Sequence, residues 1–319
     1  MNRLSQPLAS AGLLGTLASA TFALSTIALT GCSDDPRIPD GERFTRAVTG
    51  VPGVVLIDNM EDGTQYLLSD DGLTGLWYTY SDESVGSTQE PAIGFPMYRI
   101  LQEDGDPEPR SEVSPRPCGG GTEAPFFAGE TTDDCAFVAR TWGTGQRGWG
   151  AGMGLDLNGE GGVKNPYDAS QFGGIGFFAT GNVRGRSLRV NVQDARTTPE
   201  SAAAADRRGI ERCESPSQPA GRCNDHFGAI VEVTDTWKWI EIPFSCMQSG
   251  GWGFPGAGEL LTSAVVGVQF QIQGPDPADS GVLPMGATIM PFDFSIDNLA
   301  FIEVSRLANP PACPLAPRP

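Results

Sequence analysis

The sequence predicts an all-β domain, a sandwich or a barrel, and three observations lead to that prediction. Short segments in which apolar and polar residues alternate recur along the chain, as they do in half-buried strands. The 319 residues include 42 glycines and 26 prolines, which indicates many turns between the strands. No long segment has the period of an amphipathic helix, and only residues 201–212 look briefly helical. Since no helix alternates with the strands, the pattern argues against a parallel α/β sheet.

The predicted strands follow one another between residues 54 and 304. In chain order they are VVLIDNM, GLWYTYS, AFVARTWG, GAGMGLDL, GGIGFFATG, SLRVNVQD, AIVEVTD, KWIEIPF, AVVGVQFQIQ and FDFSIDNLAFIEV. Long polar segments at 101–134 and 195–224 interrupt them, and each has a pair of cysteines in it or at its end. Loops of that length in a compact domain are usually functional or cross-linked. We therefore expect one domain over 54–304 and a C-terminal tail at 305–319.

The N-terminal segment predicts export and a lipid anchor. Arg3 precedes an uncharged, mostly apolar stretch that ends in LTGC, with the cysteine at position 32, and this is the order of a secretory signal. The ending resembles the lipobox of bacterial lipoproteins, in which the cysteine is diacylated and becomes the mature N-terminus. The resemblance implies a signal peptide over residues 1–31, lipidation of Cys32 and attachment to a membrane through lipid. The alternative is a transmembrane anchor, but the stretch is rich in small residues and barely reaches the roughly 20 residues that a span requires.

The segment after the cysteine predicts how the domain is held. Residues 32–53 are polar and contain several prolines, so we expect them to form a flexible tether between the lipid and the domain. Ser33 follows the acylated position, and by the sorting habit of lipoproteins a residue other than Asp there favours the outer membrane. The expected location is therefore the outer membrane or the cell surface.

The charge of the chain limits its partners. The formal net charge is −18, and loss of the positive charge of Arg3 with the signal makes it −19. Such a surface repels nucleic acid and anionic lipid head groups, and it suits divalent cations or neutral partners. We expect no nucleic-acid partner.

The cysteines predict disulfides. The chain has seven cysteines, and setting aside Cys32 leaves six, an even number in an exported protein. Nearness in sequence suggests two pairs, and a third would tie the tail to the domain. The expected pairs are Cys118–Cys135, Cys213–Cys223 and Cys246–Cys313. A zinc site is disfavoured, because the chain has no CxxC motif and a single histidine.

Three segments of the chain resemble a known family. They are VVLIDNMEDGT, which begins at Val54, TWKWIEIPFSCMQSGGWG in the middle of the chain, and FDFSIDNLAF at residues 292–301. Together they resemble the jelly-roll carbohydrate-binding modules of the galactose-binding-like superfamily, above all the family 11 module. The resemblance covers residues 54–304 and implies a jelly-roll sandwich of two antiparallel sheets, and the cysteines predict that its long loops are disulfide-bonded. The two cysteine-bearing insertions depart from the family pattern, so no binding residue is transferred from it.

Oxygen-bearing residues near both ends of the domain predict calcium. In FDFSIDNLAF the alternation of apolar and polar residues slips at Asn298, which suggests a β-bulge. In domains of the family the first and last strands are neighbours, and a structural calcium commonly lies between them. The resemblance therefore implies a calcium site, whose candidate ligands are Asp58, Glu61, Asp62, Asp297 and Asn298. Turn chemistry is the alternative, because Asp and Asn favour turns and bulges.

The outward residues of three predicted strands suggest a binding face. Residues at i and i+2 of a strand share a face, so the apolar positions would face the core and the polar positions between them would face outward. These outward residues are Arg189, Asn191, Gln193, Trp239, Glu241, Gln269, Gln271 and Gln273. Planar amides can bond paired hydroxyls and an indole can stack on a pyranose, so this mixture suits a neutral sugar. An ordinary solvated sheet face is the alternative.

His226 is the only histidine. Its place beside a cysteine and ahead of a strand indicates a loop anchor, and contact with a ligand is a second possibility. A catalytic role would require Asp194 or Asp225 as a partner, and no nucleophile motif accompanies the histidine. Trp142 and Trp149 could rim a cleft, although packing is the commoner role of a tryptophan.

The sequence therefore predicts a lipid-anchored surface protein that binds neutral polysaccharide without catalysis. A structural or adhesive lipoprotein with no small ligand is the first alternative, and a polysaccharide-degrading enzyme is the second. A binding protein would need aromatic and amide groups on one sheet. An enzyme would need converging carboxylates, or a Tyr/His pair in a pocket.

Overall fold

The computed structural model describes the strands and the shorter connections of the domain. The described residues are 51–60, 65–67, 73–93, 138–160, 163–184, 186–199, 210–214, 222–256, 258–274, 291–308 and 313. All of them belong to one compact unit, Phe44–Pro319. The predicted signal peptide, Cys32 and most of the tether lie outside the described residues. The described part of the chain has no helix that is long and apolar enough to cross a membrane.

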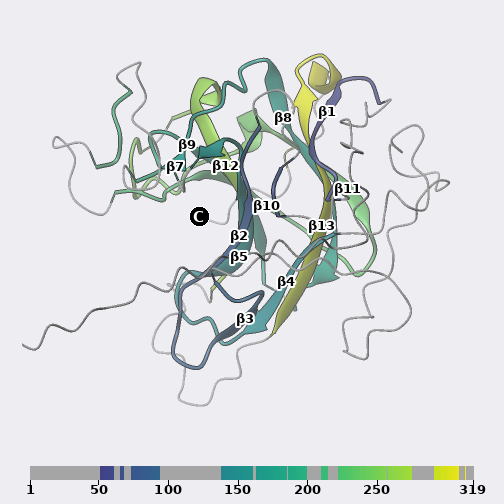
Figure 1. Cartoon of the computed structure of the whole chain (residues 1–319), viewed down its shortest axis with the longest axis vertical. Helices are drawn as coiled ribbons and strands as arrows, with labels where there is room; N and C mark the ends of the chain where they lie inside the picture. The colour runs from purple at the N-terminus through teal and green to yellow at the C-terminus, as the bar shows by residue number, and fades with distance from the viewer. Residues whose placement is uncertain are drawn as a thin grey trace, which may run out of the picture. The chain divides into compact units, whose positions relative to one another are not determined.

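Two antiparallel sheets form a sandwich, as the sequence predicts (Figure 1). The six-stranded sheet has the order β11-β8-β13-β4-β3, and β1 also pairs with β13. Its strands are β1 (Val54–Asp58), β3 (Thr88–Glu90), β4 (Ala139–Thr144), β8 (Phe172–Asn182), β11 (Lys238–Pro243) and β13 (Phe292–Glu303).

The five-stranded sheet has the order β10-β9-β12-β5-β2. Its strands are β2 (Trp77–Ser81), β5 (Gly150–Asp156), β9 (Leu188–Asp194), β10 (Phe227–Val231) and β12 (Val265–Gln273). A small hairpin pairs β6 (Gly159–Glu160) with β7 (Val163–Lys164). The helical turns of the described residues are 3-10 helices, namely η3 (Phe244–Cys246), η4 (Thr262–Ala264) and η5 (Arg306–Ala308).

The core lies between the two sheets, because alternate residues of nearly every strand are apolar and point inward. Phe270 of β12 stacks on Trp77 at 6.2 Å between ring centroids and meets Phe177 of β8 edge-on at 5.0 Å. All three rings are buried, and burial of an aromatic side chain stabilises the fold by about 1.5–3 kcal/mol. Other core residues are Met153, Leu155, Val190, Val192, Val268, Ile175, Phe294, Ile296 and Phe301.

The phase slip near the C-terminus is a β-bulge, as predicted. Between Asp297 and Ala300 the register of β13 against β8 shifts by one residue, and Asn298 has a positive φ of 49°. The edge of β13 that faces away from β8 pairs with β4 before the bulge and with β1 after it. The bulge therefore lies where this strand changes partner, and it returns Leu299 to the core.

The outer side of the six-stranded sheet carries a second apolar cluster. Trp239 of β11 packs there: its ring meets Phe178 edge-on at 5.1 Å, and it covers Gly176 so closely that a Cβ at that glycine would lie 2.5 Å from the indole. The indole N–H donates to Glu241 at 2.8 Å, and Arg306 pairs with the same carboxylate at 2.7 Å. The sequence grouped Trp239 and Glu241 with the amides of β9 and β12, and that grouping was wrong, because β11 belongs to the other sheet.

Two of the three expected disulfides lie among the described residues. They are Cys213–Cys223 and Cys246–Cys313. The first closes a loop next to β10, and the second ties residue 313 to η3, as the prediction of a fastened tail required. Cys118 and Cys135 lie outside the described residues, so their pairing stays a prediction.

Candidate functional site

The outer side of the five-stranded sheet is polar, and we call it the polar face. Its members are Tyr78 and Tyr80 of β2, Asp156 of β5, Arg189, Asn191 and Gln193 of β9, and Gln269, Gln271 and Gln273 of β12. The structure thus brings together the predicted outward residues of β9 and β12, which are neighbouring strands. It adds β2 and β5 to the same face.

Glycines in β5 make room for aromatic rings on the polar face. A Cβ at Gly152 would lie 2.9 Å from the Tyr80 hydroxyl, and one at Gly154 would lie 3.1 Å from the Tyr78 hydroxyl. The two tyrosines therefore lie over β5. Trp149, which is 52% exposed, stacks on Tyr80 with 5.9 Å between centroids and 22° between planes. Trp149, Tyr80 and Tyr78 form a continuous row, which we call the aromatic strip.

Amide side chains form a chain of hydrogen bonds across the polar face. Asn191 accepts the Arg189 Nε–H at 2.7 Å and donates to Gln271 Oε1 at 3.1 Å. Gln271 in turn donates to the Trp149 carbonyl at 2.9 Å. Because Asn191 is buried and both its amide oxygen and its amide nitrogen bond to neighbours, it positions those neighbours instead of offering a group to a ligand. Gln271 is half-exposed and its orientation is fixed by both bonds.

Lys164, from the hairpin strand β7, lies at the centre of a second polar group. Its ammonium donates to the Tyr78 hydroxyl at 3.0 Å and to Gln193 Oε1 at 3.1 Å, and it forms an ion pair with Asp156 at 2.8 Å. Gln269 also donates to the Tyr78 hydroxyl, at 3.2 Å. Burial raises the pKa of Asp156, and the ammonium beside it offsets part of that rise.

Lys164 also settles the protonation of His226. Lysine can only donate, so the Gln193 atom beside it is the oxygen, and the Gln193 NH₂ faces His226 Nε2 at 3.2 Å. His226 Nε2 is therefore the acceptor, and Nδ1–H donates to the Thr197 hydroxyl at 2.8 Å. Burial, with Lys164 and Arg189 nearby, lowers the pKa of His226 to about 3. The imidazole is neutral and structural.

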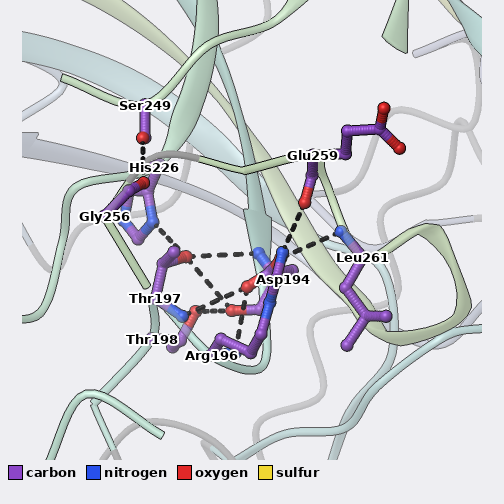
Figure 2. Close-up of polar contacts among 9 residues, drawn as sticks. All are labelled: Asp194, Arg196, Thr197, Thr198, His226, Ser249, Gly256, Glu259 and Leu261. Atoms are coloured by element: carbon purple, nitrogen blue, oxygen red, sulfur yellow. Dashed lines mark hydrogen bonds and ion pairs between the residues drawn. The ribbon is translucent and has the colours of Figure 1, made fainter. Parts of the chain in front are cut away.

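The hydroxyl of Thr197 connects His226 to the backbone carbonyl of Asp194, a residue whose carboxylate is buried (Figure 2). Asp194 accepts the backbone N–H groups of Arg196, Thr197 and Leu261, and the Arg196 guanidinium pairs with it. Arg196 also donates to the Glu259 carbonyl. These bonds fasten the end of β9 to the segment that precedes β12. Asp194 and Asp225 were the predicted catalytic partners of His226, but both ring nitrogens bond to other residues.

Three of the predicted calcium ligands lie where the first and last described strands meet. Asp58, Asp297 and Asn298 are all buried, and Asp58 is opposite Leu299 in the β1–β13 pairing. Asp58 accepts the Trp77 indole N–H at 2.7 Å and the Met60 N–H at 3.0 Å. Calcium needs about six to eight oxygens, and the described residues hold no cluster of three or more His, Cys, Asp or Glu side chains able to bind a metal. Glu61 and Asp62 lie outside the described residues, so calcium stays a prediction.

Sequence reasoning missed part of the polar face. Tyr78, Tyr80 and Lys164 were not among the predicted site residues, and Trp149 was considered only as a rim residue. The first two had a signal, because in GLWYTYS the tyrosines alternate with core residues and so share one face. Nothing in the sequence indicated Lys164, because a hairpin of two-residue strands has no periodic pattern from which its place on the polar face could be predicted.

A groove at one end of the sandwich is separate from the polar face. It has a volume of about 820 Å³ and is open to solvent. Its lining comes from β1, the start of β8 and the end of β13, and includes Val55, Tyr167, Phe172 and Glu303. The sequence did not predict it.

Comparisons with known proteins reach only the level of fold. No family model matches the chain, and no curated protein matches it. The solved structures that are similar to it include three carbohydrate-binding modules. The family 11 carbohydrate-binding module of the cellulosomal cellulase Lic26A-Cel5E of Clostridium thermocellum is 14% identical, has a TM-score of 0.38, and covers 79% of this chain and 95% of its own.

The same module from Clostridium thermocellum in complex with a β-1,3-1,4-mixed-linked tetrasaccharide gives 13% identity and a TM-score of 0.38, over 79% of this chain and 96% of its own. A family 30 carbohydrate-binding module gives 16% identity and a TM-score of 0.29, over 53% of this chain and 76% of its own. Likenesses of this degree carry no argument about the ligand, which is argued from the site itself.

Proposed function

We propose that the chain binds polysaccharide without catalysis, through the polar face. The observation that carries the proposal is the aromatic strip beside a row of half-exposed amides on one sheet. Aromatic rings stack on the apolar face of a pyranose, and fixed amides bond its hydroxyls. Trp149 is the most exposed member, so it is the first residue to test.

Neutral sugars are the ligand class that this face suits best. Each hydrogen bond to a sugar hydroxyl replaces one to water and contributes only about 0.5–1.5 kcal/mol. Affinity should therefore be modest and should rise with chain length as more sugar units occupy the strip. The net charge of −18 disfavours densely charged acidic polymers at long range.

The charged groups of the polar face support binding over hydrolysis. Glycosidases generally use two carboxyl groups on either side of the scissile bond. Among the described members of the face, Asp156 is the carboxylate, and it is engaged with Lys164. A structural or adhesive role remains the alternative if no saccharide binds.

Binding to a panel of β-glucans, xylan, mannan and galactan tests the function by affinity electrophoresis. Trp149→Ala should weaken binding about two- to tenfold, because a stacked aromatic contact contributes roughly 0.5–1.5 kcal/mol and 1.4 kcal/mol is tenfold. Trp237→Ala is the matched control, because Trp237 packs on the outer side of the other sheet, and it should bind as the wild type does. Retardation by none of the polymers contradicts the proposal, and released reducing sugar would show an enzyme.

We also propose that the domain is lipid-anchored at the outer membrane or cell surface through Cys32. The support is the LTGC ending after an apolar stretch. Radiolabelled palmitate should enter the wild-type protein and not Cys32→Ala. Equal labelling of the two proteins would contradict the anchor and leave the glycan proposal untouched.

A further inference from the structure

Arg189 is the arginine of the polar face, and three hydrogen bonds hold its guanidinium. Its Nε donates to Asn191 at 2.7 Å, and its Nη2 donates to the carbonyls of His226 and Gln248 at 3.1 and 2.8 Å. All three acceptors are neutral. Nη1 has no hydrogen bond to the described residues and is not among the buried polar atoms that lack one. It is therefore not completely buried, and Arg189 as a whole is half-buried.

Four other basic side chains of the described part of the chain are paired with carboxylates, whereas Arg222, like Arg189, bonds to a backbone carbonyl. These pairs are Arg140–Asp293, Lys164–Asp156, Arg196–Asp194 and Arg306–Glu241. Within the described residues, no carboxylate lies within ion-pair distance of Arg189. The Asp225 carboxylate acts on the guanidinium from beyond that distance, so the charge of Arg189 has no partner at contact range in a chain whose net charge is −18.

The backbone of β10 is shaped to hold this guanidinium against the sheet. Gly228 lies beneath it, and a Cβ there would lie 2.6 Å from Arg189 Nε and 2.3 Å from Asn191 Oδ1. Any other residue would push the side chain away. With Nε and Nη2 fixed, the accessible Nη1 has a set position, and a preorganised donor loses little freedom when it binds.

An exposed aromatic residue lies on the loop beside Arg189. The loop begins at Gln248, which pairs with Gly228 of β10, and it presents Trp252 at 60% exposure. Asp225 holds the loop by accepting the N–H groups of Gly250 and Gly253 at 2.7 and 2.8 Å. This edge of the sheet therefore offers a fixed cation, Arg189. It also offers an exposed aromatic ring, Trp252, four residues after the Gln248 to which Arg189 bonds.

We propose that Arg189 binds the carboxylate of an acidic sugar residue, so that the preferred polysaccharide is a neutral chain with scattered uronic acid units. This inference rests on the proposed glycan-binding function and names the substituent that the β10 edge selects. A guanidinium donates charge-assisted hydrogen bonds to a carboxylate, and these are about twice as strong as bonds between neutral groups. Trp252 would contribute stacking that does not distinguish the two kinds of sugar.

The negative charge of the whole protein does not oppose a single carboxylate at this place. Charges farther away than about 10 Å are largely screened at 0.1 M salt, whereas Nη1 would touch the ligand. A polymer with an acid on every unit meets the repulsion of the whole surface, and a sparsely substituted one does not. We therefore still expect polymers made only of uronic acid units to bind poorly.

Matched polymer pairs test the inference by affinity electrophoresis in 0.05 M salt. Each pair has a neutral member and a sparsely acidic one: β-glucan, mannan and galactan with their partially C6-oxidised derivatives, and xylan with glucuronoxylan. We expect about tenfold tighter binding of the acidic member in at least one pair, and we expect 0.5 M salt to remove most of that preference. Arg189→Gln should lose the preference, and Arg189→Lys should keep part of it.

Lys238→Gln is the matched control, because it removes one exposed positive charge from the other sheet, and it should keep the full preference. Equal or weaker binding of the acidic member in every pair overturns the inference and leaves the proposed function standing. Binding of no polymer, neutral or acidic, overturns both. If Arg189→Gln does not fold, the comparison of wild type, Arg189→Lys and Lys238→Gln over the two salt concentrations still decides.

Discussion

The two sheets of this sandwich use their outer faces in opposite ways. On the six-stranded sheet, Trp239 packs over a glycine, and its indole N–H is bonded to a carboxylate that an arginine also holds. On the five-stranded sheet, Trp149 is half exposed and stacks only along one side of a tyrosine. Both faces contain aromatic and charged residues, so composition does not separate a packing surface from a binding surface. What separates them is whether the aromatic ring is covered.

The largest effect that tests this comparison concerns stability. Trp239→Ala should lower the free energy of unfolding by about 3 kcal/mol, because truncation of a packed tryptophan loses its contacts and leaves a cavity. Trp149→Ala should cost about 0.5 kcal/mol or less, as exposed substitutions do. Urea denaturation measures both, and glycan binding should show the reverse order. Equal losses of stability would remove the distinction between the faces.

Calcium should act on the six-stranded sheet, where β13 changes partner. If the proposed site between β1 and β13 binds the ion, a hundredfold excess over Kd stabilises the native state by about 2.7 kcal/mol. The melting temperature of chelated protein should then rise by several degrees on addition of calcium, and Asp297→Asn should abolish the rise. An unchanged melting temperature in the wild type would leave the bulge as turn chemistry alone.

Acid should act beside the five-stranded sheet, because the only histidine of the chain, His226, immediately precedes β10. The pKa of His226 is lowered to about 3 in the fold, against about 6.5 in an unfolded chain. The unfolded state therefore binds a proton that the native state does not, and the stability that this provides above pH 6.5 is lost as the pH falls towards 3. Between pH 7 and pH 5 the loss is about 2 kcal/mol.

Urea denaturation of wild type and His226→Gln at the two pH values measures this term. The variant should lose about 2 kcal/mol less than the wild type between pH 7 and pH 5, since its other titratable groups are the same. Parallel pH dependence in the two proteins would show that the histidine is not held neutral.

The sequence identified the strands well, because the alternation of apolar and polar residues is a local signal. The same alternation located the bulge at Asn298, where the phase changes within a single strand. It could not say which sheet a strand joins, since that depends on pairing with distant segments. KWIEIPF and SLRVNVQD look alike in sequence, yet one belongs to each sheet, and Trp239 was misplaced for that reason.

The candidate site was predicted in part for a similar physical reason. Gln269 and Gln271 were found because neighbouring outward positions repeat along one strand. Lys164 was missed because it reaches the face from a hairpin of two-residue strands, which has no periodic pattern. Asn191 and Gln193 were predicted as ligand contacts, and the structure shows both buried and bonded to neighbours.

The position of β13 has a consequence for how this chain comes to its fold. It is the last strand of the domain and yet lies inside its sheet, between β8 on one edge and β4 and β1 on the other. The first strand pairs with it, Val54 opposite Ile302, so the closing contacts join nearly the two extremes of the domain. Non-local pairing of this kind makes folding slow. Until residues 292–303 emerge, β1, β4 and β8 have unpaired edges that invite association between chains. A chain secreted from its N-terminus would thus depend on factors that shield these edges until translocation ends.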